Sequence, residues 1–341
     1  MSPRCVARDR YAGPVDTADG ISEETPEDSI RPSVVFVVGW ERSGTTLLGN
    51  ILGLSAGAFH VGELSQLWNR ARKSDLCGCG RPLTECQFWA EVVMLLPEDP
   101  LSRPGDEVGE LRDRFASLRR TWPMLLGLRS RRQQRLLGEF SGLLEGAYRA
   151  VGTATKASLI IDISKVPAMI PALDLMTELD VTFVHLIRDS RAVVHSGTRG
   201  RYEDMRRGVL ENAARWVLWN LAAEGFRRRS RRPWLRLRYE DLSADPAGAV
   251  AEIARVVPAL RDFDLTDHLV GERLMFTENH TVQGIAPRFK KGSVRIQTDD
   301  EWITDLSFGR WLLTTMLTFW MLPMYGYRLS RRRLARMAAQ S

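Results

Sequence analysis

A glycine-containing segment in the first part of the chain has the composition of an anion-binding loop. Residues 39–46 read Gly-Trp-Glu-Arg-Ser-Gly-Thr-Thr and directly follow the β-branched and aromatic run 34–38. Two glycines between a buried strand and a helix start leave backbone N–H groups pointing inward at the positive end of the helix dipole. Nucleotide triphosphatases place a Lys after the second glycine, but here Thr45 follows Gly44 and the cation is Arg42. The spacing predicts a cradle for phosphate or sulfate oxygens and disfavours an ATPase or GTPase; a glycine-rich turn without a ligand is the alternative.

A second segment has the charge needed to bind another phosphate. Residues 184–196 read Val-His-Leu-Ile-Arg-Asp-Ser-Arg-Ala-Val-Val-His-Ser, which places Arg188 at the end of a strand and Ser196 further along, on the next helix. Both can face the carboxyl edge of the sheet, where ligands bind in open α/β folds. Charge-assisted hydrogen bonds from Arg to phosphate are strong and geometrically selective. The alternative is a surface ion pair between Arg188 and Asp189.

Together, the two segments resemble the donor site of sulfotransferases, which use 3′-phosphoadenosine 5′-phosphosulfate (PAPS). The resemblance implies that the first segment binds the 5′-phosphosulfate, through Arg42, Ser43, Gly44, Thr45 and Thr46. It also implies that Arg188 and Ser196 bind the 3′-phosphate. PAPS is therefore the expected co-substrate, and no metal is expected at this site.

Two later segments extend the resemblance over roughly residues 34–302. Arg238-Tyr239-Glu240-Asp241-Leu242 is similar to the family segment whose Tyr contacts the adenine, which implies that role for Tyr239, with a core Tyr at a strand end as the alternative. Residues 279–284 and the basic stretch after them resemble the loop that folds over the nucleotide. The nucleotide ligands implied there are Arg288, Lys290, Lys291 and Gly292.

Some residues depart from the pattern of the animal cytosolic branch of this family. Arg42 stands where that branch has Lys, and Leu47 where it has Trp. The segments are closer to the bacterial and tyrosylprotein-type branches, so they do not indicate a phenolic acceptor. The expected acceptor is a hydroxyl group of a carbohydrate, a glycolipid or a secondary metabolite. A P-loop kinase and a non-catalytic nucleotide-binding protein are the alternative functions.

Sulfuryl transfer also needs cationic stabilisation and a base for the acceptor hydroxyl. Lys165 lies between a strand and a helix, where the family often has Ser-Lys or Asn-Lys with the amine near the transferring group. Glu63 follows a glycine in a segment that looks like the one carrying the catalytic Glu of tyrosylprotein-type enzymes. His60 is the second candidate base, because its ordinary pKa suits proton abstraction. A helix N-terminal charge is the alternative role for Glu63.

Three cysteines lie close together in the sequence, at Cys77, Cys79 and Cys86. A zinc site needs four ligands, and these thiols have neither a fourth partner in the sequence nor the paired C-x-x-C spacing. We therefore expect structural or unlinked cysteines. A disulfide and a metal site completed by a partner are the alternatives, and the stretch resembles one of bacterial sulfotransferase-like proteins that would form an ordered lid near the acceptor.

Alternating strand and helix patterns predict an α/β fold with a P-loop-like central parallel sheet flanked by helices. The expected strands are 34–38, 159–161, 181–187 and 235–239, with one more near His60. The expected helices are 46–54, 167–178, 190–198, 211–229 and 246–257. We expect a single domain at 33–330 with a helical insertion at about 98–153, a disordered leader at 1–32 and a basic tail at 331–341.

The charge balance of the chain points to an anionic ligand. The 341 residues carry 48 Lys and Arg against 42 Asp and Glu, and Lys is scarce, so most of the cations are Arg. The N-terminal residues lack an apolar signal segment, which favours a cytoplasmic protein. The apolar run 311–322 is too short to span a bilayer and predicts a buried C-terminal helix. Arg clusters at 227–232 and 331–333 favour a solvated face over weak membrane-surface association, and no nucleic-acid motif accompanies them.

Overall fold

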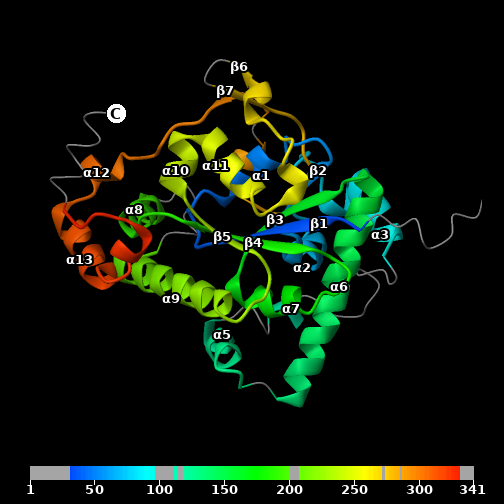
Figure 1. Ribbon diagram of the computed structural model, residues 1–341, viewed down its shortest axis with the longest axis horizontal. Coiled ribbons are helices and arrows are strands. Elements are labelled where there is room, and N and C mark those ends of the chain that lie inside the picture. Colours follow the sequence, from blue (N-terminus) through cyan, green and yellow to red (C-terminus); the bar gives the residue numbers. More distant parts are fainter. Residues whose placement is uncertain are drawn as a thin grey trace, which may run out of the picture.

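Five parallel strands form the central sheet of the computed structural model (Figure 1). The structure describes residues 31–96, 111–113, 118–128, 130–199, 207–270, 273–284, 286–289 and 291–330. The strands are β1 (Ser33–Val38), β2 (Ala58–Gly62), β3 (Leu159–Lys165), β4 (Val181–Ile187) and β5 (Trp234–Arg238). Their order across the sheet is β2-β3-β1-β4-β5, and every neighbouring pair is parallel. The predicted α/β class with a central parallel sheet is confirmed.

The sheet separates two apolar cores, and β1 shows how. Its side chains alternate in direction, as in any strand. Val34, Phe36 and Val38 pack with α6 (Arg131–Thr155) and the other elements below the sheet in Figure 1. Val35 and Val37 instead pack with elements above it. A strand covered on both faces has to be apolar throughout, which is why residues 34–38 form an unbroken apolar run.

The helices divide between these two faces. Above the sheet lie α1 (Thr45–Leu52), α10 (Tyr239–Ala244) and α11 (Pro246–Ala254). The helices on the other side include α6, α7 (Ile170–Asp174) and α9 (Val209–Arg227). The other α-helices and strands of the described residues are α2 (Leu67–Arg72), α3 (Gln87–Met94), α5 (Leu118–Leu125), α8 (Ser190–Arg199), α12 (Trp302–Asp305), α13 (Phe308–Thr318), β6 (Leu269–Val270), β7 (Arg273–Phe276) and β8 (Gly292–Arg295). The last three form a small antiparallel sheet.

Strand β3 is longer than the sequence pattern predicts because polar side chains are satisfied inside it. Asp162 is fully buried, yet it accepts hydrogen bonds from the Tyr148 hydroxyl at 2.6 Å and from the Ser164 backbone N–H at 2.6 Å. Burial raises the pKa of Asp162 to about 6. Since the pattern stopped at the first polar residue, it missed the strand end that carries Lys165.

The expected helical insertion is represented by α5 and α6, while residues 97–110, 114–117 and 129 lie outside the described part. Helix α6 starts at a capping box in which Ser130 and Gln133 satisfy each other's backbone N–H groups. Its apolar face packs against the sheet, with Phe140, Leu144 and Tyr148 fully buried. The expected leader and basic tail fall almost entirely on residues 1–30 and 331–341, which also lie outside the described residues.

The prediction of a buried C-terminal helix is wrong. In α13 the buried side chains are the threonines Thr314, Thr315 and Thr318, and Thr318 shares a hydroxyl hydrogen bond with Ser190 at 2.8 Å. Apolar residues of the same helix face outward, and Met316 is 64% exposed. The threonines hydrogen-bond to carbonyls one turn back, so the polar stripe can pack inward. Among the described residues, no helix has the length and apolarity needed to cross a membrane.

Candidate functional site

The carboxyl ends of the five parallel strands supply the side chains of one cavity. A volume of about 660 Å³ is open along this edge of the sheet. Each strand contributes a candidate at or just beyond its end, and all five line the cavity: Arg42 after β1, Glu63 after β2, Lys165 at the end of β3, Arg188 after β4 and Tyr239 after β5. Because β1 connects to β2 on one side and β4 lies on its other side, the cavity sits at the switch point where ligands bind in such sheets.

The predicted anion-binding loop has the backbone of a cradle. Gly44 adopts the left-handed conformation, with φ +89°, immediately before α1. A Cβ at this position would lie 2.4 Å from Cδ2 of Tyr239, so only glycine allows the loop and the ring to pack together. Arg42, Thr45 and Thr46 also line the cavity. The loop thus presents the N-terminus of α1 to the cavity, with Arg42 beside it.

Ser43 takes a different position within this loop. It is 1% exposed and does not line the cavity. Its hydroxyl has no hydrogen-bond partner among the described residues. Of the loop residues predicted to bind the donor, Ser43 is therefore the one that the fold turns inward.

Arg188 directly follows β4 and lines the same cavity as Glu63. Its guanidinium donates to the backbone carbonyl of Arg42 at 3.1 Å and forms an ion pair with the Asp299 carboxylate at 2.8 Å. It also stacks over the Tyr239 ring, 4.3 Å from the centroid. The Nε–H of Arg188 is buried without a partner among the described residues. A buried guanidinium that lines a cavity and has an unused donor is suited to binding an oxyanion.

The structure does not contain the surface ion pair between Arg188 and Asp189 that was the alternative role for Arg188. Asp189 is buried and binds Arg191 instead, through two side-chain contacts at 2.8 and 2.6 Å. Ser196, on α8, lines the cavity together with Arg188, as the spacing predicted. The fold brings these two predicted phosphate ligands to the same cavity.

Glu63 and Lys165 form a contact that the sequence did not reveal. The Lys165 amine donates to Oε1 of Glu63 at 2.5 Å. Glu63 is 5% exposed, and its backbone N–H donates to the carbonyl of Val282 at 2.7 Å. Its side chain makes no capping hydrogen bond to the short helix that follows, which argues against the helix-charge alternative. The buried carboxylate and the partly exposed ammonium therefore form one ion pair that lines the cavity.

Two tryptophans of α9 hold the backbone of the site in place. The indole N–H of Trp216 donates to the carbonyl of Arg188 at 3.0 Å, and that of Trp219 donates to the carbonyl of Lys165 at 3.1 Å. Lys165 has a positive φ of 67°, a strained conformation for a side chain with a Cβ. The three-residue spacing of Trp216 and Trp219 on the helix predicts that both belong to the core, and Trp216 is fully buried. The cavity-lining role of Trp219 had no signal in the sequence.

His60, the second candidate base, does not reach the cavity. It is 7% exposed, and its ring packs against α1, where a Cβ on Gly49 would lie 2.4 Å from the ring Nε2. Burial lowers the pKa of His60 to about 3. In β2 the side chains alternate between the two faces of the sheet, and His60 points into the α1 face. The geometry therefore gives no support to His60 as the base.

The basic residues of the late loop also lie away from the cavity. Arg288 is buried and donates to the carbonyl of Leu76 at 2.9 Å, beside the cysteines. Lys291 pairs with Glu278 at 2.5 Å on the exposed surface. Gly292 begins β8 with φ +82° and does not line the cavity, while Lys290 lies outside the described residues. Segments on either side of this stretch do reach the cavity, through Gln283, Gly284, Phe276 and Val294.

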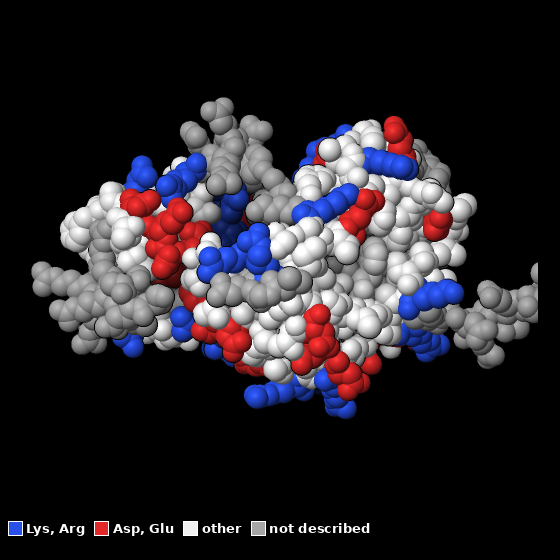
Figure 2. Space-filling view, turned by 90° about the horizontal axis from the view of Figure 1, so that it is seen from above, with Lys and Arg blue, Asp and Glu red and all other residues white. Residues whose placement is uncertain are grey.

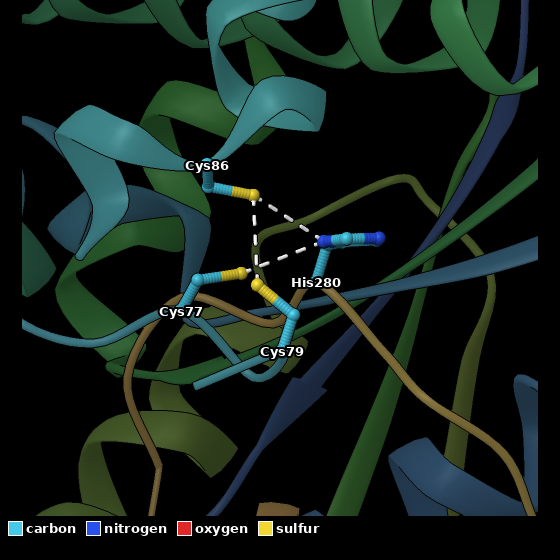
Figure 3. A group of neighbouring side chains, drawn as sticks. All are labelled: Cys77, Cys79, Cys86 and His280. Atoms are coloured by element: carbon cyan, nitrogen blue, oxygen red, sulfur yellow. Dashed lines mark hydrogen bonds between the residues drawn. The ribbon is translucent and has the colours of Figure 1, made fainter. Parts of the chain in front are cut away.

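The cysteines have the fourth partner that the sequence spacing lacked. Figure 3 shows Cys77, Cys79 and Cys86 with His280, which the late loop brings beside them. Nδ1 of His280 lies 3.7 Å from Sγ of Cys77 and 3.4 Å from Sγ of Cys86, and the Sγ atoms of Cys79 and Cys86 are 3.8 Å apart. The sequence argument that no fourth residue completes the group is therefore wrong, because His280 comes from a segment about two hundred residues away in the sequence.

A second group with metal-ligand chemistry, His195 with Glu301 and Asp305, is organised differently. The guanidinium of Arg199 lies 2.6 Å from Glu301 and 3.3 Å from Asp305. The carboxylates are exposed and already balanced by this cation. We interpret the group as a surface ion-pair network.

Surface charge is mixed on the face shown in Figure 2, where Lys and Arg are interspersed with Asp and Glu. Some arginines of the cluster on and after α9 form ion pairs or hydrogen bonds within the fold. Arg227 pairs with Glu224 at 3.0 Å, and Arg232 donates to the carbonyl of Leu179 at 3.1 Å. Within the described part of the chain, these contacts favour the solvated-face interpretation of that cluster.

Comparison with known proteins decides the family. The profile described as "Sulfotransferase family" matches residues 32–257, which include the anion-binding loop and the four strand ends that follow it. The chain belongs to the sulfotransferase family. The resemblance drawn from the motifs is confirmed, and a transferase function follows from the family. A comparison with curated protein sequences gives no match.

Solved sulfotransferases share detectable similarity with this chain. The sulfotransferase domain of an olefin synthase from Synechococcus PCC 7002 is 23% identical over 72% of this chain and 82% of that domain, with a TM-score of 0.36. Sulfotransferase STF9 from Mycobacterium avium is 12% identical over 88% of this chain and 78% of its own, with a TM-score of 0.40. A sulfotransferase from Alicyclobacillus acidocaldarius is 14% identical over 89% and 99%, with a TM-score of 0.38.

Proposed function

We propose that this sulfotransferase moves a sulfuryl group from PAPS to an acceptor hydroxyl in the cavity at the carboxyl edge of the sheet. One observation carries the proposal. Two separate sets of anion-binding groups, around Arg42 and around Arg188, line the same cavity as a buried carboxylate, Glu63. A donor with a phosphosulfate at one end and a 3′-phosphate at the other needs two such sets, whereas ATP needs one.

The donor would bind across the ends of the central strands. The backbone N–H groups at the start of α1 and the Arg42 guanidinium bind the 5′-phosphosulfate, because the helix dipole and the cation both favour negative charge there. Arg188 and Ser196 bind the 3′-phosphate. The Tyr239 ring, which already packs against Gly44 and Arg188, provides a flat apolar surface for the adenine.

The Arg188 and Asp299 ion pair gives this binding mode a specific requirement. The Asp299 carboxylate occupies one edge of the guanidinium, and the Nε–H has no partner among the described residues. The 3′-phosphate would therefore take the unused donor or displace the half-exposed Asp299 side chain. Discrimination against nucleotides without a 3′-phosphate follows, since they leave the Arg188 contact unmade.

The transfer is an in-line displacement at sulfur. The acceptor oxygen forms a bond to sulfur while the bond from sulfur to the 5′-phosphate oxygen breaks, and adenosine 3′,5′-bisphosphate leaves. Glu63 accepts the proton of the acceptor hydroxyl, and Lys165 and Arg42 stabilise the charge on the transferring and leaving oxygens. The protein does no covalent chemistry in this scheme, so positioning and charge supply the catalysis.

The acceptor binds on the Glu63 side of the cavity. Gln66, Arg112, Val166 and Trp219 line the same cavity as Glu63. Polar and aromatic side chains suit a hydroxylated acceptor such as a carbohydrate, a glycolipid or a secondary metabolite. His60 and the late-loop basic residues Arg288 and Lys291 have no part in the scheme, because they do not line the cavity.

A thermal-shift comparison tests the donor. We expect adenosine 3′,5′-bisphosphate to raise the melting temperature clearly more than ATP or GTP at equal concentration, because a ligand stabilises the fold according to its affinity. Stabilisation by ATP alone would contradict the proposal and favour a kinase. Release of adenosine 3′,5′-bisphosphate from PAPS, measured with a panel of hydroxylated acceptors, then separates the enzyme from a non-catalytic nucleotide-binding protein.

A further inference from the structure

We propose that Cys77, Cys79, Cys86 and His280 bind a structural zinc ion, which fastens the late loop to the wall of the candidate active site. The four ligand atoms all lie within 4.8 Å of one another, although His280 is far from the cysteines in sequence. Figure 3 shows the sulfur atoms and Nδ1 of the histidine converging on one point from three segments of the chain. This convergence is the observation on which the proposal depends.

The distances fit tetrahedral zinc. With zinc–sulfur bonds of about 2.3 Å and a zinc–nitrogen bond of about 2.0 Å, a tetrahedron places sulfur atoms about 3.8 Å apart and sulfur about 3.5 Å from nitrogen. The observed separations are 3.8 Å between Cys79 and Cys86, and 3.7 and 3.4 Å from His280 to Cys77 and Cys86. A disulfide between Cys79 and Cys86 would need its sulfur atoms at about 2.05 Å.

The ligand set selects the metal and its role. Three thiolates and one imidazole are the donors of closed, four-coordinate structural zinc sites, which leave no open position for substrate. On binding, the three thiols release their protons to solvent, and the zinc with its ligands carries a net charge of −1. Arg288 lies beside the cluster, 7% exposed, with Nε and one terminal nitrogen unpartnered among the described residues. A buried cation at this place balances that charge.

The local backbone is built for a metal-binding turn. The Cys77 N–H donates to the carbonyl of Arg81 at 2.7 Å, and the Gly80 N–H donates to the carbonyl of Cys77 at 2.8 Å. Gly80 has φ +88°, which allows the chain to reverse between the first two cysteines and the third. A Cβ on Gly78 would lie 1.9 Å from Oδ1 of Asn279, so the late loop packs directly on the turn. The turn and the loop therefore fit together only with glycine at this position.

The cluster lies next to the candidate site through a short series of contacts. His280 is followed by Val282, whose backbone pairs with Cys77 on one side and with Gly62 on the other. The carbonyl of Val282 accepts the N–H of Glu63 at 2.7 Å. Gln283 and Gly284, next along the loop, line the cavity. Zinc would thus fix the loop that supports the proposed base, without touching the reacting atoms.

The first test is metal analysis of the full-length chain, purified without chelators and without a metal-affinity tag. Plasma mass spectrometry should find one zinc per chain. After zinc is removed and cobalt(II) chloride is added, the absorption spectrum should show thiolate-to-cobalt charge-transfer bands and the d–d bands of a tetrahedral ion. Absence of both zinc and cobalt binding, with the cysteines found as free thiols or as a Cys79–Cys86 disulfide, would overturn the proposal.

Single substitutions test the ligands. Cys79→Ser and His280→Ala should each abolish or strongly lower the bound zinc, whereas Cys5→Ser removes the fourth cysteine of the chain and should leave one zinc per chain. Zinc retained in both ligand variants would contradict the assignment. If these variants fail to fold, the conservative Cys79→His should keep zinc, and the cobalt spectrum of the unsubstituted chain still decides the question.

The consequence for the candidate site has its own readout. Removal of zinc should reduce the thermal stabilisation by adenosine 3′,5′-bisphosphate, and zinc chloride should restore it. The effect of zinc on stabilisation by the bisphosphate rests on the proposed function, whereas the metal content does not. One zinc per chain with no response to the bisphosphate would support the metal site and overturn the donor. A full response in a chain without zinc would overturn the proposed loop-fixing role.

Discussion

The cavity at the strand ends and the cysteine–histidine cluster are neighbours in space but are built in opposite ways. Five side chains of the cavity lie at or just after the ends of strands of one parallel sheet, so the fold positions them through backbone hydrogen bonds along each strand. The cluster depends on two loops, which meet through a few contacts around Gly78 and Val282. A sheet edge is rigid by construction, whereas two crossing loops need a cross-link.

This difference explains what could be read from the sequence. Strand ends can be located from apolar runs, and their residues must share one edge of a parallel sheet. The strand ends and the family resemblance together therefore allowed Arg42, Arg188 and Tyr239 to be assigned to one site. The meeting of Cys77 with His280 could not, because it depends on the path of loops that no local pattern specifies. The contact between Lys165 and Glu63 had no sequence signal for another reason, since it requires β2 and β3 to be neighbours in the sheet, and the sequence does not give the strand order.

Where the sequence predictions differ from the structure, packing is the cause. The late loop carries Arg288 and Lys291 close to the motif positions of the family, yet one guanidinium is drawn to the Leu76 carbonyl and one amine to Glu278. In α13 the threonines turn inward and Met316 turns outward, contrary to the expectation from hydropathy. Local composition predicted that these elements exist, whereas tertiary contacts determine which of their side chains are buried.

The largest expected effect comes from breaking the ion pair of Glu63 and Lys165 at the strand ends. Glu63→Gln keeps the side-chain shape but removes the proton acceptor, so turnover should fall about 10²- to 10⁴-fold, the usual contribution of a general base. The affinity for adenosine 3′,5′-bisphosphate, measured by calorimetry, should stay near that of the unsubstituted chain. Glu252→Gln, an exposed site on α11, is the matched control. Turnover that is unchanged in Glu63→Gln would remove Glu63 from the mechanism.

A smaller effect is expected at Arg188. Arg188→Ala should lower the affinity for adenosine 3′,5′-bisphosphate by about 10- to 100-fold, because a charge-assisted contact of about 1.5–3 kcal/mol is lost. Binding of AMP, which has no 3′-phosphate, should change little. Arg255→Ala removes an exposed Arg from the end of α11 and should alter neither affinity. An equal loss for both nucleotides in Arg188→Ala would show that Arg188 does not recognise the 3′-phosphate.

The smallest effect is expected at His60, which belongs to neither site, and it concerns the pH dependence of the free energy of unfolding. Its pKa is lowered to about 3 by burial from an ordinary value of 6.5, so its contribution to stability is complete above pH 6.5 and is lost as the pH falls toward 3. Between pH 7 and pH 5 the loss should be about 2 kcal/mol, at about 1.4 kcal/mol per pH unit below 6.5. His60→Leu should remove this pH dependence in urea denaturation.

The comparison is made between the two proteins at each pH because Asp162 acts in the opposite direction. Its pKa is raised to about 6, so its contribution to stability is complete below pH 3.8 and is lost as the pH rises through about 6. Both proteins contain this Asp, so it cancels in the difference. Identical pH profiles for the two proteins would contradict a neutral, buried His60.

The central claim is that the five strand ends form one site for a nucleotide with two separate anionic groups. A crystal structure with adenosine 3′,5′-bisphosphate tests it most directly. The account predicts the 5′-phosphate on the N–H groups at the start of α1, the 3′-phosphate on Arg188 and Ser196, and the adenine on the Tyr239 ring. A bisphosphate bound elsewhere, or bound with its 3′-phosphate away from Arg188, would contradict it.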